Sequence, residues 1–228
     1  MKKNIFFAMM LALAGFSLTS CDGDKDSEGK SRFTYYAVLE MNGDAVMTTP
    51  VGAAFTDPGC TATMGGEDVT AKIQTSGSVN TNQPGFYKLN YVVVNEDGFS
   101  ASASRTVAVV DPKNFASAYL SEAQYGSRHY YNLPVVIKDN GDGTFTIDDI
   151  AGGFYAYGRY PGYPYDFSLE STLKLNPDNT VELVECDGGK WYWGDPIDIT
   201  SGTYDPETGT VTLIEDFGGT PMYVTLTK

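Results

Sequence analysis

The chain has 228 residues and a formal net charge of −14, because its 29 acidic residues outnumber its 15 basic ones. A nucleic-acid-binding surface must be basic to displace counterions from phosphate, so this charge excludes nucleic acid as a partner. One histidine, three cysteines and no CxxC motif give no basis for a transition-metal site, and we predict neither a metal nor a cofactor.

Residues 1–20 are typical of a bacterial lipoprotein signal peptide. Lys2 and Lys3 precede an apolar run, residues 5–18, that is too short to span a membrane and has the length of a signal core. The run ends in LTSC, the lipobox pattern of small residues before a lipidated cysteine. We therefore predict lipidation of Cys21, since two or three acyl chains make membrane attachment effectively permanent. The mature chain then keeps 13 basic residues and a formal charge of −16.

Residues 21–32 are polar, acidic and without apolar periodicity, a composition typical of a flexible tether. An acidic run directly after the lipidated cysteine resembles the surface-export signal of lipoproteins in the Bacteroidetes. This resemblance implies an outer-membrane protein that faces the cell exterior, and a plain tether is the alternative.

The rest of the chain is long enough for two domains of ordinary size. Helical periodicity is nearly absent, and short β-branched and aromatic runs alternate with Gly, Asn, Asp and Pro, as in sandwiches and barrels. We predict an all-β protein, with an Ig-like β-sandwich in residues 33–111 and an antiparallel β-barrel or sandwich in residues 112–228. The boundary lies at Asp111-Pro112, because proline cannot donate to a strand ladder.

In the first domain, GFYKLNYVVVNEDGFSASASRTVAVV predicts a hairpin, with residues 87, 89, 91 and 93 on one face of its first strand. Together with GAAFTDPGCTAT and EDVTAKI, this stretch resembles the bacterial Ig-like repeats of secreted and surface proteins. Cys60 departs from that pattern, which favours a small aliphatic residue there. Cys60 and Cys186 fall in different predicted domains, so we favour buried free thiols over a disulfide without excluding the latter.

In the second domain, alternating apolar residues predict inward faces for three segments, residues 133–137, 167–175 and 222–226. DNGDG at residues 139–143 suits a tight hairpin better than a calcium loop, which needs oxygen ligands at other spacings. The whole mature chain resembles two-domain lipoproteins of gut Bacteroidetes that accompany starch-utilisation-type glycan-uptake systems. The matching stretches are DNGDGTFTIDDIAGGFYAYGRY, LKLNPDNTVEL, SGTYDPETGTVTL and VTLTK.

The stretch GGFYAYGRYPGYPYDF, residues 152–167, is too rich in rings for a linker and too interrupted for a core strand. We expect Tyr155 and Tyr157 to share one face of a strand, followed by a loop over residues 159–164. Tyrosine combines a flat apolar face with a polar tip and is enriched at binding surfaces, and the apolar faces of sugar rings suit such a platform.

A second cluster, residues 190–195, contains both tryptophans, with Trp191 and Trp193 on one face and Tyr192 on the other. Core packing is the competing interpretation, and we favour it for Phe154, Phe167 and one tryptophan. For Arg159 we favour stacking on a tyrosine over contact with a ligand. The candidate ligand-binding residues are Tyr155, Tyr157, Arg159, Tyr160, Tyr163, Tyr165, Trp191 and Trp193.

No catalytic residues are predicted. A glycosidase needs two carboxylates that flank the scissile bond, and Asp166, Glu170, Asp195 and Glu215 are available, but nothing selects a pair. We predict a non-catalytic outer-membrane surface lipoprotein that binds glycan through its C-terminal domain, with the Ig-like domain as a spacer. The alternative is a structural subunit that docks on an outer-membrane transporter.

Overall fold

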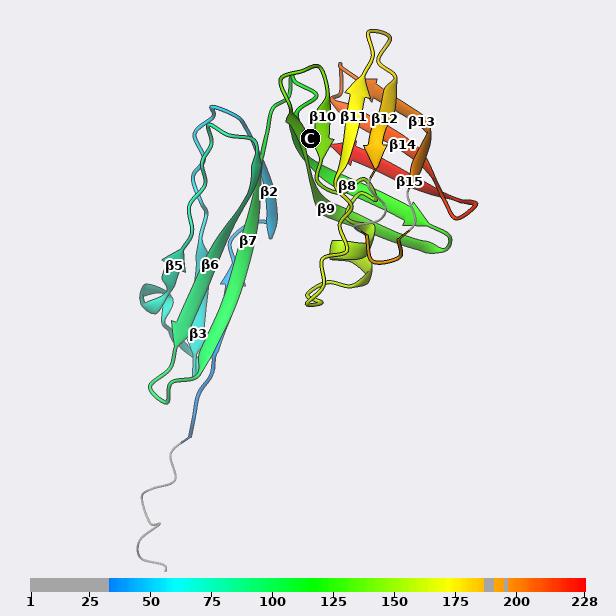
Figure 1. The fold of residues 1–228 in the computed structure, drawn as a ribbon. Helices are drawn as coiled ribbons and strands as arrows, with labels where there is room; N and C mark the ends of the chain where they lie inside the picture. Colours follow the sequence, from blue (N-terminus) through cyan, green and yellow to red (C-terminus); the bar gives the residue numbers. More distant parts are fainter. Residues whose placement is uncertain (1–32, 187–190, 195–196) are drawn as a thin grey trace, which may run out of the picture. The chain divides into compact units, whose positions relative to one another are not determined.

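The computed structural model describes residues 33–186, 191–194 and 197–228, and these residues form an almost exclusively β structure (Figure 1). The predicted all-β class is therefore confirmed. The predicted signal peptide, the lipidation site Cys21 and the tether lie outside the described residues. No described helix is long and apolar enough to cross a membrane.

The Ig-like domain contains seven strands in two sheets, with the orders β1-β3-β4 and β2-β7-β6-β5. All pairings are antiparallel except that of β2 with β7, which is parallel. A single 3₁₀ turn, η2, covers Thr70–Lys72. The strands are β1 Ala37–Met41, β2 Val46–Pro50, β3 Cys60–Met64, β4 Glu67–Asp68, β5 Gln74–Ser76, β6 Gly85–Val94 and β7 Ser100–Val110.

The apolar faces of the two sheets form the core of this domain. Leu89, Tyr91 and Val93 of β6 are buried as the alternation predicted, and Tyr87 on the same face is partly buried. Cys60 of β3 packs against Leu89 and Tyr91 as a free buried thiol, and burial raises the pKa of this thiol. Cys60 therefore occupies the place of a small aliphatic side chain.

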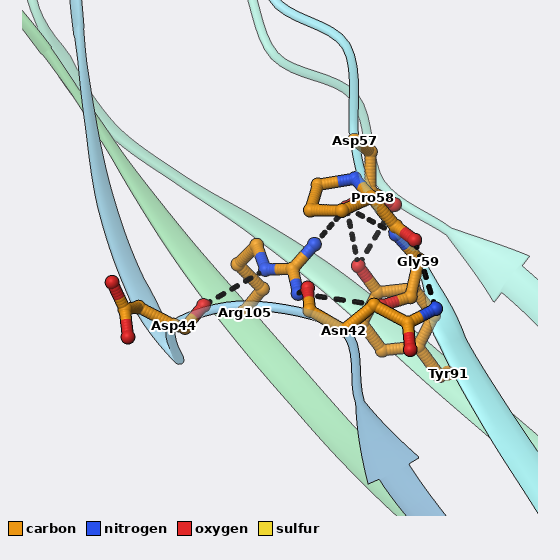
Figure 2. A network of polar contacts seen from close by, with 7 residues as sticks. All are labelled: Asn42, Asp44, Asp57, Pro58, Gly59, Tyr91 and Arg105. Carbon is orange, nitrogen blue, oxygen red and sulfur yellow. Dashed lines mark hydrogen bonds and ion pairs between the residues drawn. The ribbon is translucent and has the colours of Figure 1, made fainter.

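One charged side chain, that of Arg105 on β7, is fully buried in this domain (Figure 2). Its Nε donates to the carbonyl oxygen of Asp44 at 3.0 Å, and its Nη2 donates to the carbonyl oxygens of Asn42 and Gly59. Its Nη1 forms an ion pair with Asp57. The guanidinium thereby joins two loops, one between β1 and β2 and one before β3.

Asp57 completes the network by accepting hydrogen bonds from the hydroxyl of Tyr91 at 2.8 and 2.9 Å (Figure 2). Burial and the Asp57 carboxylate raise the pKa of Tyr91 to about 12. Every buried polar group of a charged side chain needs a partner, and this network supplies partners for the guanidinium. Arg105 lies on the same inward face of β7 as Val107. This inward position was not predicted from the sequence.

The C-terminal domain is one antiparallel sheet of eight strands, in the order β12-β11-β10-β9-β8-β15-β14-β13 (Figure 1). A short π-helical turn, η3 Phe154–Arg159, interrupts the strands. The strands are β8 Ser117–Tyr125, β9 Arg128–Asp139, β10 Phe145–Ile147, β11 Ser171–Leu175, β12 Val181–Cys186, β13 Asp198–Asp205, β14 Thr210–Phe217 and β15 Thr220–Thr227.

The two edge strands of this sheet, β12 and β13, meet at a bridge between Thr180 and Thr203. A Cβ atom on Gly202 would lie 2.3 Å from the carbonyl oxygen of Val181, so only glycine allows this close approach. The sheet is consequently a nearly closed barrel, which decides between the predicted barrel and sandwich.

The core of the barrel follows the predicted alternation in most strands. Residues 133, 135 and 137 of β9 are buried, as are residues 222, 224 and 226 of β15. Cys186 is a free thiol but only partly buried. The DNGDG stretch is a turn, in which the carboxylates of Asp139 and Asp142 accept the N–H groups of Gly141 and Thr144.

The prediction of a strand across residues 167–175 is wrong in its first half, because β11 begins only at Ser171. The N–H of Leu169 donates to the carboxylate of Asp149, and the N–H of Ser168 donates to the carboxylate of Asp166. Side chains thus take backbone donors that a strand ladder would need.

Replacing Asp57 with Asn is expected to destabilise the Ig-like domain, because the buried guanidinium of Arg105 loses its countercharge. Removal of one partner of a buried pair costs about 3–5 kcal/mol, and we expect the lower end because Asp57 is partly exposed. Both tryptophans lie in the C-terminal domain. The urea concentration at the unfolding midpoint should therefore fall when unfolding is followed by far-UV circular dichroism. The midpoint followed by tryptophan fluorescence should not change.

Asp44→Ala is the matched control, because only the backbone carbonyl of Asp44 contacts Arg105. Equal unfolding midpoints for wild type and Asp57→Asn in circular dichroism would contradict this account of the network.

Candidate functional site

The aromatic stretch of residues 152–167 begins with two glycines inside the barrel. Gly152 and Gly153 have φ values of +63° and +77°, and a Cβ on Gly152 would lie 2.7 Å from the Ser121 hydroxyl. This left-handed start turns the chain into η3, where the N–H groups of residues 157 and 158 donate to the carbonyl oxygen of Gly153. The predicted strand with Tyr155 and Tyr157 on one face is therefore wrong.

The helical turn places these two tyrosines in different environments. Tyr155 is buried, whereas the side chain of Tyr157 is 51% exposed. On the side of η3 that faces β9, a Cβ on Gly158 would lie 2.6 Å from the ring of Tyr130. Glycine at position 158 thus lets η3 lie directly against the strand.

The carboxylate of Asp149, itself fully buried, holds both ends of the aromatic stretch. It accepts the N–H groups of Ala151 at 3.1 Å and Gly153 at 3.0 Å, just before η3, and that of Leu169 at 3.2 Å, just after the loop. Burial raises the pKa of Asp149 to about 7, and the three N–H donors oppose this effect.

A second fully buried carboxyl, that of Glu215 on β14, interacts electrostatically with Asp149. Neither carboxyl oxygen of Glu215 has a hydrogen-bond partner within the described part of the chain. Burial, and after it the charge of Asp149, raises the pKa of Glu215 well above its usual range. Both effects favour the protonated form of this carboxyl group.

Buried rings form a base beneath the surface of the aromatic stretch. Phe154, Tyr155, Phe167 and Trp191 belong to the barrel core, in agreement with the core interpretation of two phenylalanines and one tryptophan. The indole N–H of Trp191 donates to the carbonyl oxygen of Phe167 at 2.9 Å. Trp193 is half-buried, with its ring centroid 4.5 Å from that of Tyr155. The four buried rings are the base, and the more exposed rings of the aromatic stretch pack on them.

Above the base lies a connected surface of rings, which we call the aromatic platform. Its members are partly or largely exposed. Five of the six rings contact another ring of the set, and the sixth, that of Tyr157, lines a common hollow with Tyr163 and Tyr165. Tyr163 is 63% exposed, Tyr192 is 58% exposed and Tyr165 is 45% exposed. The Tyr165 centroid lies 5.0 Å from that of Tyr192, and the Tyr160 centroid lies 5.7 Å from that of Tyr163. The platform comprises Tyr157, Tyr160, Tyr163, Tyr165, Tyr192 and Trp193.

The predicted site residues thus divide between core and surface. Tyr155 and Trp191 lie in the core, where they support the platform without presenting their rings. Arg159 lies over the ring of Tyr160, with its guanidinium carbon 5.3 Å from the centroid, as the stacking interpretation favoured. The other five predicted residues belong to the platform.

Sequence reasoning missed two residues of the site. Tyr192 was assigned to the face opposite the tryptophans, yet its ring contacts Tyr165. Asp166 was considered only as a possible catalytic acid, although its place between Tyr165 and Phe167 puts it inside the aromatic stretch. A shallow hollow of about 340 Å³ is lined by residues 156–157 and 162–167, Asp166 included.

Comparison with known proteins identifies both parts of the chain. Residues 39–109 match the model of the bacterial surface protein Ig-like domain, and residues 109–228 match a family model for a C-terminal domain. The chain is similar to the lipoprotein BT2262 from Bacteroides thetaiotaomicron, with 32% identity over 85% of this chain and 100% of that chain and a TM-score of 0.58. These matches confirm the resemblance to two-domain surface lipoproteins.

Two structures from Clostridium perfringens ZmpB are also similar in part. One contains CBM51-2 in complex with GlcNAc and INT domains, with 18% identity over 77% of this chain and 29% of that chain and a TM-score of 0.28. The other is the M60 catalytic domain with CBM51-1 and CBM51-2, with 14% identity over 85% and 21% and a TM-score of 0.29. Both TM-scores are too low to indicate a shared fold. None of the curated proteins matches the chain.

The two raised carboxyl pKa values predict an unusual pH dependence for the barrel. In the unfolded chain both groups titrate near pH 4, so above that pH the folded state binds more protons than the unfolded state. Their contribution to stability is full below about pH 4. For Asp149 it is lost as pH rises through the folded-state pKa of about 7, and for Glu215 it is lost as pH rises toward the raised pKa of that group. Exposed carboxyls with lowered pKa values, such as those of Asp142 and Asp178, act in the opposite sense but only below pH 4.

We therefore expect the melting temperature, followed by tryptophan fluorescence, to fall between pH 5 and pH 8. Glu215→Gln should raise the melting temperature at pH 8 and flatten this slope, because the amide never ionises. Glu185→Gln, at an exposed position of β12, is the control. A melting temperature that rises toward pH 8 would contradict the assignment.

Proposed function

The chain belongs to the family of the lipoprotein BT2262, and we propose that it is a non-catalytic surface lipoprotein that binds glycan through the aromatic platform. The observation that carries this proposal is the exposure of connected rings on a base of buried rings. Tyr163, Tyr165 and Tyr192 are large apolar side chains at the surface, and the buried rings below hold them in place.

Sugar rings match such a surface because their C–H faces are apolar and their edges carry hydroxyls. Tyrosine loses little conformational entropy when it is held, and its hydroxyl can hydrogen-bond at the edge of the sugar. The strongly acidic chain favours an uncharged ligand, since nucleic acids and anionic surfaces are repelled.

The location that we propose for the protein rests on the pattern of its first residues and on its family. We propose that lipidated Cys21 anchors the chain in the outer membrane, that the acidic tether directs it to the exterior, and that the Ig-like domain serves as a spacer. Similarity to a lipoprotein and to a bacterial surface Ig-like domain supports this arrangement.

The proposal that the protein is non-catalytic is supported by the placement of its carboxyl groups. Hydrolysis of a glycosidic bond needs two carboxyl groups that both reach the substrate. Asp166 lines the hollow beside the platform rings, whereas Glu215 is fully buried in the barrel and Glu170 is exposed but does not line the hollow. Asp195, also considered from the sequence, lies outside the described residues.

The alternative function is docking on an outer-membrane transporter, because exposed apolar patches also mark protein contacts. The exposed tyrosines of the platform suit either partner. Purification from detergent-solubilised membranes separates the two: a stoichiometric protein partner that stays bound when glycan is added favours docking.

Replacing Tyr163 and Tyr165 together with Ala is expected to weaken glycan binding at least about tenfold, which corresponds to about 1.4 kcal/mol. The physical reason is the loss of two exposed rings from the platform, while the base remains. Calorimetry or affinity electrophoresis against a panel of polysaccharides measures the effect.

Tyr223→Ala is the matched control, since Tyr223 is a similarly exposed tyrosine on β15 outside the platform. If no polysaccharide binds the wild-type protein, or if the double variant binds as well as wild type, glycan binding by the platform is refuted.

A further inference from the structure

We propose that Asp166 contacts the ligand of the aromatic platform and restricts that ligand to uncharged glycans. This inference rests on the proposed function and adds the chemical class of the ligand. Asp166 is the one charged side chain among the described residues that line the hollow, and three tyrosines line it as well.

The carboxylate of Asp166 is held in a fixed orientation by the backbone that follows it. Its Oδ1 accepts the N–H of Ser168 at 2.9 Å and the hydroxyl of Ser168 at 2.7 Å. Ser168 precedes Leu169, whose N–H donates to buried Asp149, so this turn is tied to the barrel core. Oδ2 takes part in no hydrogen bond with the residues that the structure describes, and Asp166 is exposed.

A fixed, exposed carboxylate oxygen beside aromatic rings is suited to accept hydrogen bonds from sugar hydroxyls. Hydrogen bonds to a charged acceptor are roughly twice as strong as neutral ones. A sugar whose apolar face lies on Tyr163 or Tyr165 directs its hydroxyls toward the rim of the hollow. The rings then provide apolar contact, and Asp166 provides the polar contact that selects the ligand.

The same carboxylate disfavours ligands that carry negative charge. Uronate and sulfate groups placed in the hollow would lie close to Asp166, and no cation among the described residues that line the hollow would offset the repulsion. Arg159, the cation of the aromatic stretch, lies over Tyr160 and does not line the hollow. The pKa of Tyr157 is raised by burial and further by the negative charges of three aspartates, Asp166 among them.

Asp166→Asn tests this role without removing the turn, because the amide oxygen can still accept the N–H of Ser168. Asp142→Asn is the matched control: the Asp142 carboxylate accepts the N–H and hydroxyl of Thr144 in the same way, in a hairpin turn away from the platform. Thermal melts of both variants report whether the fold is unchanged.

The probes are neutral polysaccharides (amylopectin, galactomannan, mixed-linkage β-glucan, xyloglucan and yeast mannan) and acidic ones (polygalacturonate, alginate and chondroitin sulfate). Binding is measured by affinity electrophoresis and calorimetry at 0.15 M and 0.5 M NaCl. The higher salt screens the long-range repulsion from the acidic chain and leaves the short-range effect of Asp166.

We expect wild type to bind at least one neutral polysaccharide and none of the acidic ones at either salt concentration. Asp166→Asn should bind the neutral ligand about tenfold more weakly, as expected for a lost hydrogen bond to a charged group, and Asp142→Asn should match wild type. Neutral binding that is unchanged in Asp166→Asn, or wild-type binding to an acidic polysaccharide, overturns this inference and leaves glycan binding intact. Absence of binding to every polysaccharide overturns both.

Discussion

The aromatic surface of this protein depends on one buried carboxylate, that of Asp149. It accepts backbone N–H groups from Ala151 and Gly153 on one side of the aromatic stretch and from Leu169 on the other. A loop with many rings and two prolines has few ladder hydrogen bonds of its own, so its ends must be fixed from elsewhere. Asp149 fixes them inside the barrel, where it interacts electrostatically with a second fully buried carboxyl, that of Glu215.

Burial of charge organises both domains, but by different means. In the Ig-like domain, the guanidinium of Arg105 gathers the loop carbonyls of residues 42, 44 and 59 and pairs with Asp57. In the barrel, a carboxylate gathers N–H groups. In each case a buried side chain hydrogen-bonds backbone groups that lie outside the strands, where no ladder supplies partners.

The strands could be predicted because one face of each is buried. Burial of one face requires an apolar residue at every second position, as in residues 133–137 and 222–226. The sequence did not reveal the contacts that end this pattern. Leu169 alternates correctly with its neighbours, yet its N–H bonds Asp149, twenty residues earlier. In the site, glycines and prolines indicated exposed rings, but the π-helical turn that separates Tyr155 from Tyr157 depends on the packing of Gly158 against Tyr130. No local pattern contains that contact.

The central claim is that one connected surface of tyrosines binds glycan, and side-chain footprinting with hydroxyl radicals tests it most directly. Oxidation of the individual tyrosines is compared with and without a bound neutral polysaccharide. The account predicts protection of Tyr163, Tyr165 and Tyr192, with Tyr131 and Tyr223, exposed elsewhere on the barrel, unchanged. Protection at Tyr131 or Tyr223 with none on the platform, or no protection by any polysaccharide, would contradict it.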